Sequence, residues 1–289
     1  MARDRTNLGP AAPGEPPRGY MTFFPIRIRE LFLLRREYVS PRMVRLTLGG
    51  PNLAVPTFEA HVADEHVKLL FPNEDGVLAV PIQLENFLDW IDPQPVSRDY
   101  TIRAHRPEAA GGSGEVDIDL VVHEGGLAST WATTAELGSG IWVAGPPRGV
   151  VIPDEFTWQA YVGDETALPA IARRLEELPR TQRGVAIIEV ADAGEEQQID
   201  APDGVELIWL HRNGIEAGAS TLLGDAVATI EIPRDEPAYV WAAGETFAMK
   251  PVRRWARAAG LGKDQHDVVG YWRRGASGSE HDHEPGHDH

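Results

Sequence analysis

The stretch Ser97-Arg98-Asp99-Tyr100-Thr101-Ile102-Arg103 decides how this chain is interpreted. Residues two apart in an extended strand share a face. We expect one face to present Arg98, Tyr100 and a second guanidinium at Arg103, with Thr101 at its edge. A guanidinium binds a pyrophosphate through two contacts, an aromatic ring lies against a flat heterocycle, and a hydroxyl bonds its edge. The stretch therefore combines the residue types that bind a flavin nucleotide. The alternative is an ordinary strand, because Tyr and Thr also favour strands.

The segments around this stretch read as short strands separated by Gly and Pro turns. Strands are expected at 26–38, 43–48, 66–71, 98–106, 115–122 and 141–144, with one helix at 128–137. Gly111-Gly112-Ser113-Gly114 is expected to join two of them as a hairpin. In 115–122, Asp117 and Asp119 alternate with apolar residues, which indicates one solvent-exposed face and one buried face. Strands at this spacing predict a small antiparallel β-barrel.

The predicted pattern of secondary structure changes after about residue 153. Strands are expected at 158–162, 184–190, 205–210, 239–243 and 268–271, with helices between them. Alternating strands and helices predict an α/β domain with an open, doubly wound parallel sheet. The predicted organisation is a disordered leader (1–24), a flavin-binding barrel (25–153), an α/β domain (154–275) and a flexible His/Asp/Glu-rich tail (276–289).

Composition excludes several classes of function. The 289 residues carry a net charge of −17, which disfavours nucleic acid and anionic membranes as partners. There is no cysteine, so thiolate metal sites and cysteine nucleophiles are excluded, and redox chemistry must come from a cofactor. No apolar run approaches the ~20 residues needed to span a bilayer. We expect a cytoplasmic protein.

Three further segments carry candidate site residues, each with a simpler structural alternative. The run His123 to Ser129 leads from a strand into a helix start, where backbone amides bind anions, but it also fits a plain glycine turn. The turns 163–166 and 244–245 end parallel strands and would line a cleft, or merely cap helices. The run 271–275 joins two aromatics to Arg273 and Arg274, and fits an anion site or a capped terminal strand.

The tail 276–289 holds four of the ten histidines, with carboxylates between them. Imidazole and carboxylate suit borderline divalent metals, but ordering a flexible tail costs entropy. The sequence favours a solvated acidic tail, and no metal site is assigned.

The blocks of sequence together resemble the siderophore-interacting protein family, whose members include ferric siderophore reductases. The resemblance covers roughly residues 25–275, with the blocks in order and at similar spacing. The residues that carry it are Arg98–Arg103, Asp117–His123, Gly126–Ala132, Gly145–Gly149, Gly163–Ala170, Trp241–Glu245 and Gly270–Gly275.

This resemblance implies an FAD-binding barrel, a ferredoxin reductase-like α/β domain, and reduction of Fe(III) in a ferric siderophore to Fe(II), which is then released. By position it assigns the cofactor contacts to Arg98, Tyr100, Thr101, Arg103, His123, Ala128, Ser129 and Thr166. Lys68, Arg148 and Arg273 are the cations expected to face the siderophore. Two alternatives stay open: a flavin reductase serving another acceptor, and a siderophore-binding module without turnover.

The electron donor also stays open among NADH, NADPH and a small redox protein such as reduced ferredoxin. The wider superfamily has a glycine-rich turn where this chain has Asp164 and Glu165, and a cysteine near Gly244, which is absent here. Asp164 and Glu165 are expected to repel a dinucleotide's phosphates. The acidic residues between 189 and 196 are expected to disfavour a 2′-phosphate.

Overall fold

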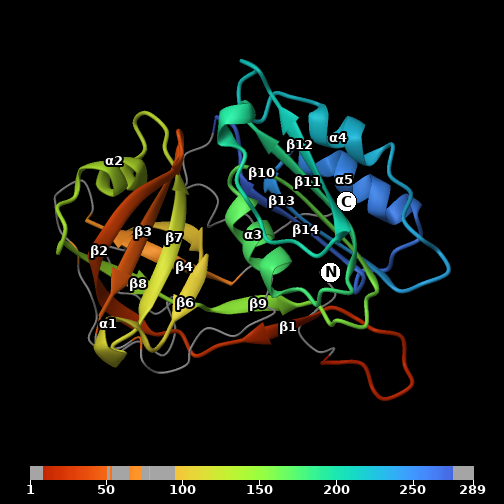
Figure 1. Cartoon of the computed structure of the whole chain (residues 1–289), viewed down its shortest axis with the longest axis horizontal. Coiled ribbons are helices and arrows are strands. Elements are labelled where there is room, and N and C mark those ends of the chain that lie inside the picture. Colours follow the sequence, from red (N-terminus) through yellow and green to blue (C-terminus); the bar gives the residue numbers. More distant parts are fainter. Residues whose placement is uncertain (1–8, 51–52, 54–64, 73–77, 79–94, 276–289) are drawn as a thin grey trace. The chain divides into compact units, whose positions relative to one another are not determined.

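The computed structural model describes residues 9–50, 53, 65–72, 78 and 95–275 (Figure 1). Its contacts divide the chain into two compact units. The described residues between 22 and 149 form one unit, and residues 9–21 and 150–275 form the other. The boundaries inferred from sequence, 25–153 for the barrel domain and 154–275 for the α/β domain, stay a proposal.

The first unit is built on a seven-stranded sheet in the order β5-β4-β8-β2-β3-β7-β6, with every neighbouring pair antiparallel. Its strands are β2 (Ile28–Ser40), β3 (Met43–Gly49), β4 (His66–Phe71), β5 (Val96–Thr101), β6 (Ala104–Arg106), β7 (Glu115–Val121) and β8 (Gly140–Ala144). The helices are α1 (Ala109–Gly112) and α2 (Leu127–Thr134). The predicted glycine linker thus includes one short helical turn.

The two edges of this sheet are consecutive in the chain, which closes the barrel. β5 forms one edge and β6 the other, and only Ile102 and Arg103 separate them. Two backbone bonds tie this crossing to both sides: the Ile102 N–H donates to Glu65 O at 2.9 Å, and the Arg103 N–H donates to Asp117 O at 2.8 Å. The predicted single strand 98–106 is therefore two strands with a seam between them, and the predicted antiparallel barrel is confirmed.

The interior of the barrel follows the two-residue period of its strands. Alternate residues of β4 and β7 are fully buried in one apolar cluster, with contributions from β2, β3, β8 and α2. Members from β4 and β7 are Val67, Leu69, Phe71, Val116, Ile118 and Leu120. Burying such side chains is worth about 1.5–3 kcal/mol each, so this cluster holds the strand register that positions the candidate site.

The second unit contains a parallel five-stranded sheet in the order β12-β11-β10-β13-β14. Its strands are β10 (Trp158–Asp164), β11 (Arg183–Val190), β12 (Gly204–His211), β13 (Ala238–Glu245) and β14 (His266–Trp272). The order runs outward in both directions from β10, so the topological switch point lies between β10 and β13. The prediction of a doubly wound parallel sheet is confirmed.

Helices cover both faces of this sheet. They are α3 (Leu168–Glu177), α4 (Leu222–Val227) and α5 (Met249–Ala258), and a 3-10 turn spans Ala193–Glu195. α4 and α5 pack with Val162, Val240 and neighbours on one face. Arg174 of α3 bonds Tyr161 on the other face. Pro251 lies in the first turn of α5, which a helix tolerates. Among the described helices none is long and apolar enough to cross a membrane.

One small sheet was not predicted from the sequence. β1 (Tyr20–Phe23) pairs with β9 (Arg148–Val151), and the division between the units passes through both strands. The Gly19 N–H donates to Asp264 O at 2.7 Å. The segment 1–24 was expected to be a disordered leader, and that expectation is wrong for its last residues. Residues 1–8 and the tail 276–289 lie outside the described residues.

Candidate functional site

β5 carries Arg98, Tyr100 and Thr101 on an edge strand of the barrel. Arg98 is half-buried and donates to Ser97 O at 2.7 Å. Tyr100 packs against the barrel core, and burial raises the pKa of its phenol to about 12, with Arg98 acting in the opposite direction. Thr101 is 6% exposed. The phenol therefore stays protonated at neutral pH and can donate a hydrogen bond.

The register of β5 against β4 sorts these side chains onto two faces. Arg98 lies opposite Leu69 and Tyr100 lies opposite Val67, so both share the face of the barrel core. Lys68 lies opposite Asp99 on the other face, and its Nζ donates to the Asp99 carboxylate at 3.0 Å. The positive charge of Lys68, expected to face the siderophore, is thus balanced by its own neighbour.

Arg103 lies beyond the end of β5, so it does not continue the face of Arg98 and Tyr100 as the sequence predicted. Ile102 takes that alternate position and is completely buried in the barrel core. The Arg103 guanidinium lies 3.9 Å from Asp119. The physical reason is the seam, since the chain turns here from one edge of the sheet to the other.

His123 lies on the connection from β7 to α2 (residues 122–126, the α2 turn), and Ala128 and Ser129 lie in the first turn of α2. The Ser129 hydroxyl donates to Val121 O and accepts from the His123 N–H, both at 3.2 Å. In this arrangement the single hydrogen of the Ser129 hydroxyl is used by the protein itself. A Cβ at Gly126 would lie 2.4 Å from the ring of the exposed His123 side chain, which would have to move to make room for it.

The residues of β5 fit the phosphate and ring contacts of FAD. Among the described residues Arg98 forms no ion pair, so its remaining guanidinium donors are free for a pyrophosphate. Tyr100 offers a half-buried aromatic ring beside it. A Cβ at Gly125, which has a φ of +75°, would meet no atom within 4 Å, so the backbone of the α2 turn is open to a ligand.

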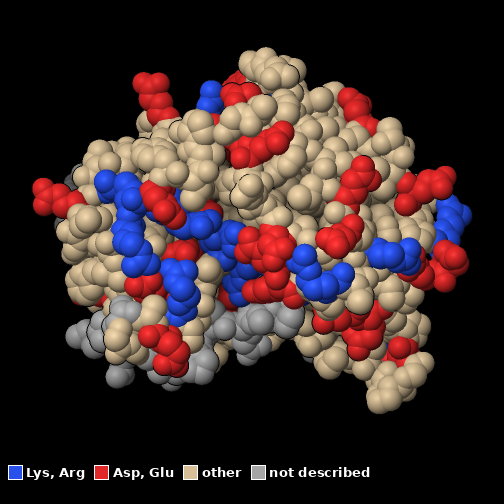
Figure 2. Space-filling view, in the orientation of Figure 1, with Lys and Arg blue, Asp and Glu red and all other residues tan. Residues whose placement is uncertain are grey.

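The outer face of β7 is covered by ion pairs, so the prediction that this face is exposed to solvent is wrong. Asp117 and Asp119 are only 5% and 4% exposed. Arg45 contacts Asp119 through two bonds of 2.7 Å, Arg106 contacts Asp117 at 2.6 and 2.7 Å, and Thr47 donates to Asp117 at 2.8 Å. Figure 2 shows basic side chains along this part of the barrel, with acidic ones between them.

These ion pairs predict that the protein loses stability in acid. Burial alone would raise the pKa of Asp117, but hydrogen bonds from Arg106 and Thr47 outweigh it and lower the pKa below 3.8. The hydrogen bond from Arg35 is the main reason that the pKa of Glu115 lies below 4.5. Carboxylates with depressed folded-state pKa values stabilise the fold above the unfolded values, and this stability is lost as the pH falls through the folded ones.

We therefore expect the free energy of unfolding, measured by urea denaturation, to fall steeply below about pH 4.5. Asp117→Asn should flatten part of this slope, because the titrating group is gone. The matched control is Glu136→Gln, an exposed acid on the same unit, which should leave the slope unchanged. An Asp117→Asn protein with the full wild-type slope would contradict the assignment.

The carboxyl edge of the parallel sheet carries a buried carboxylate at Asp164. One oxygen accepts from the Thr166 backbone and hydroxyl at 2.9 and 2.5 Å. The other accepts from Glu245 N at 2.9 Å and the Trp272 indole N–H at 2.8 Å. Burial, followed by the charge of Glu165, raises the pKa of Asp164 to about 6. Thr166, predicted to line the cofactor site, serves here to hold Asp164.

Glu165 belongs to a second cluster of charged residues, which is largely buried. Arg212, 4% exposed, contacts both oxygens of Glu165 and lies 3.4 Å from Glu189. Ser220 donates to the other oxygen of Glu189. The negative charges at 164 and 165 were expected to repel phosphates. In the structure both are engaged by donors of the protein itself.

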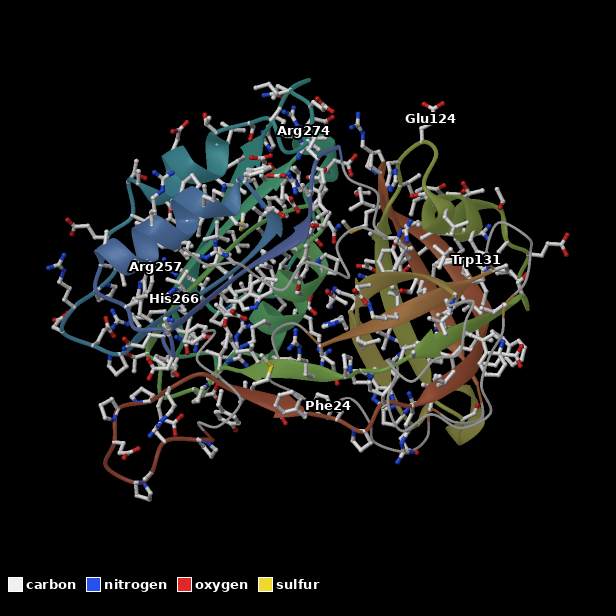
Figure 3. The ribbon with its side chains drawn as sticks, turned by 180° about the vertical axis from the view of Figure 1, so that it is seen from behind. Phe24, Glu124, Trp131, Arg257, His266 and Arg274 are labelled. Carbon is white, nitrogen blue, oxygen red and sulfur yellow. The ribbon has the colours of Figure 1, made fainter. Side chains whose placement is uncertain are left out.

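The other two cations predicted to face a siderophore lie on different units. Arg148 is the first residue of β9 and is exposed. Arg273 follows β14, and its guanidinium lies over the Phe247 ring, 5.3 Å from the centroid. Figure 3 shows that the neighbouring Arg274 is at the opposite end of β14 from His266, where the strands end. Arg273 therefore belongs to the carboxyl edge.

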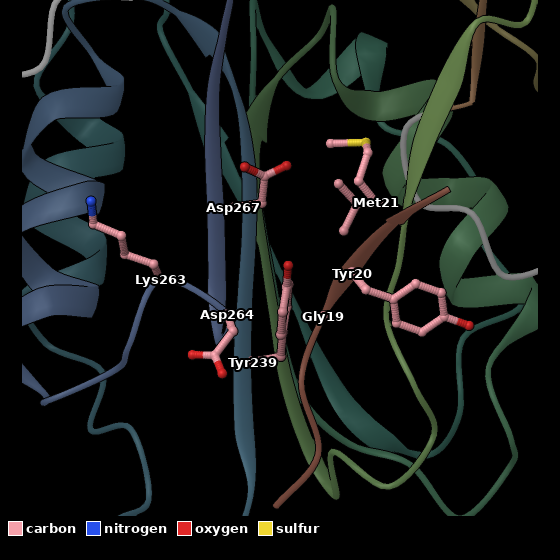
Figure 4. A pocket seen from close by; sticks show the side chains of 8 residues that line it. Gly19, Tyr20, Met21, Tyr239, Lys263, Asp264 and Asp267 are labelled. Carbon is pink, nitrogen blue, oxygen red and sulfur yellow. The ribbon is translucent and has the colours of Figure 1, made fainter. Parts of the chain in front are cut away.

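A small cavity of about 240 Å³ lies at the opposite edge of the sheet (Figure 4). Its lining includes the second residues of β13 and β14, which places it at the amino ends of the strands. Lining residues are Gly19, Tyr20, Met21, Val150, Tyr239, Lys263, Asp264 and Asp267. Nucleotides bind at the carboxyl ends of such strands, so this cavity is separate from the candidate donor site.

Comparison with known proteins agrees with this arrangement. A model described as siderophore-interacting FAD-binding domain matches residues 33–150, and one described as siderophore-interacting protein matches residues 156–275. An NADPH-dependent ferric-chelate reductase from Escherichia coli is 33% identical over 86% of this chain and 93% of its own. The ferric vibriobactin reductase ViuB from Vibrio cholerae is 32% identical over 86% and 90%. A siderophore utilization protein from T. fusca has a TM-score of 0.80 and 42% identity, covering 90% and 97%.

Proposed function

This chain belongs to the siderophore-interacting protein family, and from that membership we infer that it is an FAD-dependent reductase of Fe(III) in a ferric siderophore. Each Fe(III) would take one electron, so the two electrons of a reduced FAD would serve two ferric siderophores, and the iron would leave as Fe(II). We propose that this release occurs in the cytoplasm. The observation that carries the proposal is the β5 pair, a guanidinium with free donors beside a half-buried tyrosine ring, within a chain that has no cysteine.

FAD supplies the redox chemistry that this chain's own side chains lack. We propose that Arg98 holds its pyrophosphate, that Tyr100 lies against its ring, and that Thr101 bonds the ring edge. The amides of the α2 turn, with Gly125 open beside them, support a second phosphate contact. Ser129 acts indirectly: its hydrogen bonds to Val121 and His123 fix the conformation of this turn.

For the donor we propose NADH in preference to NADPH. The ends of β11 and β12 are acidic, and their one buried guanidinium, Arg212, is already paired with Glu165 and Glu189. Glu196 is paired with His211 at 2.8 Å. A 2′-phosphate brings two negative charges and needs a cation with free donors, whereas an unphosphorylated ribose does not. A small redox protein is the remaining donor.

One anaerobic experiment tests this function and its donor together. The FAD-loaded protein is mixed with NADH or NADPH while flavin absorbance is followed, and a ferric siderophore is then added with an Fe(II)-specific chelator. We expect faster bleaching with NADH, followed by reoxidation and Fe(II) capture. Flavin that stays reduced in the presence of a ferric siderophore would contradict the reductase. Faster bleaching with NADPH would contradict only the donor preference.

A further inference from the structure

The backbone on both sides of Arg273 is fixed by hydrogen bonds. The Trp272 carbonyl accepts from the Thr246 N–H and hydroxyl, both at 2.9 Å. A Cβ at Gly270 would lie 2.6 Å from that hydroxyl, so glycine is what allows Thr246 to approach. On the other side, the Arg274 N–H donates to Glu245 at 3.2 Å. Arg273 is therefore held by its neighbours in the chain.

Asp164 is the centre of this arrangement. Asp164 is 5% exposed, and its carboxylate joins the turn after β10 to the last residues of β13 and β14. Gly244 has a φ of +155°, and a Cβ there would come within 2.8 Å of the Asp164 carboxylate. Only a glycine therefore lets β13 end this close to Asp164. Among the donors to Asp164, Trp272 is the residue next to Arg273 in the chain, so Asp164 acts on Arg273 through Trp272.

Glu245, 1% exposed, fixes the residue against which Arg273 packs. Its carboxylate accepts from the Phe247 and Ala248 amides at 2.6 and 2.9 Å. The Phe247 side chain is 49% exposed, with the Lys250 Nζ 4.4 Å and the Arg273 Cζ 5.3 Å from its ring centroid. We call Phe247, Lys250 and Arg273 the cation shelf.

The cation shelf is an uncompensated positive site on an acidic chain. Among the described residues neither Lys250 nor Arg273 forms an ion pair, whereas the adjacent Arg274 pairs with Glu216. Two like charges beside one ring repel each other, although the ring faces attract both. An anion between them relieves this repulsion and gains charge-assisted hydrogen bonds.

We propose that Asp164 is a positioning residue that holds Arg273 on Phe247 through Trp272, which makes the cation shelf a preformed site for a multivalent anion. This rests on the proposed function for its sources of anion, which are the negatively charged ferric siderophore and the pyrophosphate of the donor. Both ligands carry several negatively charged oxygen atoms close together. The site lies at the carboxyl edge, beside the switch point where such sheets bind ligands.

The kinetic test separates the two sources. Trp272→Phe removes the indole donor with little change of volume, and Lys250→Gln removes one shelf charge. We expect each to raise the KM for one substrate roughly tenfold, as for loss of one charge-assisted bond, with kcat within about twofold. A rise for the ferric siderophore assigns the shelf to it, and a rise for NADH assigns it to the donor. Arg254→Gln, one turn along α5, is the matched control and should change neither.

A second measurement needs no turnover. The indole N–H resonance of Trp272, identified by its loss in Trp272→Phe, should move in Asp164→Ala. It should move less in Asp164→Asn, whose amide oxygen can face Trp272 while its NH₂ donates to the Thr166 hydroxyl. Inorganic pyrophosphate should shift this resonance in the wild type and not in Lys250→Gln.

The outcomes are distinguishable. An indole resonance unchanged in Asp164→Ala would overturn the positioning role. A resonance that moves, with unchanged KM for both substrates and no response to pyrophosphate, would overturn the anion site. If the wild type reduces no ferric siderophore, the proposed function fails, while the resonance and pyrophosphate measurements still decide on Asp164 and the shelf.

Discussion

We expect the Arg98→Ala protein to bind FAD about 1.5–3 kcal/mol more weakly, or roughly 10- to 150-fold. The reason is that Arg98 donates only to Ser97 O and has no carboxylate partner among the described residues. A guanidinium left with free donors on an edge strand suits a pyrophosphate. The dissociation constant can be measured by isothermal titration of the apoprotein with FAD.

Arg35→Ala is the control for this result. The Arg35 side chain is 57% exposed and pairs with Glu115. Its loss removes one positive charge from the same unit and leaves β5 unchanged, because Arg35 lies on β2. We expect FAD affinity within about twofold of the wild type, as for an exposed pair. Unchanged flavin occupancy of Arg98→Ala after gel filtration would refute the assignment of the pyrophosphate contact.

The largest loss of stability is expected for Arg212→Met. Arg212 is buried between Glu165 and Glu189, with a side chain 3% exposed. Its removal leaves two carboxylates, 16% and 4% exposed on their side chains, without their shared cation. Breaking a buried pair in this way costs about 3–5 kcal/mol, which is a large part of the stability of an ordinary domain. Denaturant midpoints measured on the purified protein check this.

Arg180→Met makes the comparison specific. Arg180 pairs with Asp200 at 3.0 Å, but the two side chains are 58% and 81% exposed. Solvent screens such a pair, so we expect a change of only about 0–1 kcal/mol. If Arg212→Met cost no more than Arg180→Met, burial would not be what makes the Arg212 cluster strong. Adding Glu165→Leu to Arg212→Met should recover part of the loss.

Most of the fold could be predicted from the sequence because its signals are local. Apolar periodicity and glycine turns located both sheets, and 66–71 is a strand with those bounds in the structure. The missed strands β1 and β9 are four residues each and pair only with each other. Neither has an alternating pattern long enough to stand out among the prolines around it. The break of 98–106 at Ile102 also has no local signal, because barrel closure depends on distant strands.

The site was harder to predict, because charges look alike in a sequence whether they are free or paired. Asp117 and Asp119 suggested solvent, but the arginines that bury them lie on β3 and β6. Lys68 suggested a free cation, but its partner Asp99 lies across a strand pair. From the sequence alone, Asp164 is interpreted as a charge that repels phosphates and Glu245 as part of a turn. Their role depends on donors 81 and 29 residues away, which only the folded sheet brings together.

The seam of the barrel has one more consequence. The strand that would grip the cofactor, β5, continues through Ile102 and Arg103 into the strand that completes the cylinder. A ligand held by β5 and by the α2 turn would therefore bridge the two edges of the sheet that this connection joins. Binding only the closed form favours closure by mass action, so loading with the cofactor would also stabilise the barrel against opening between β5 and β6.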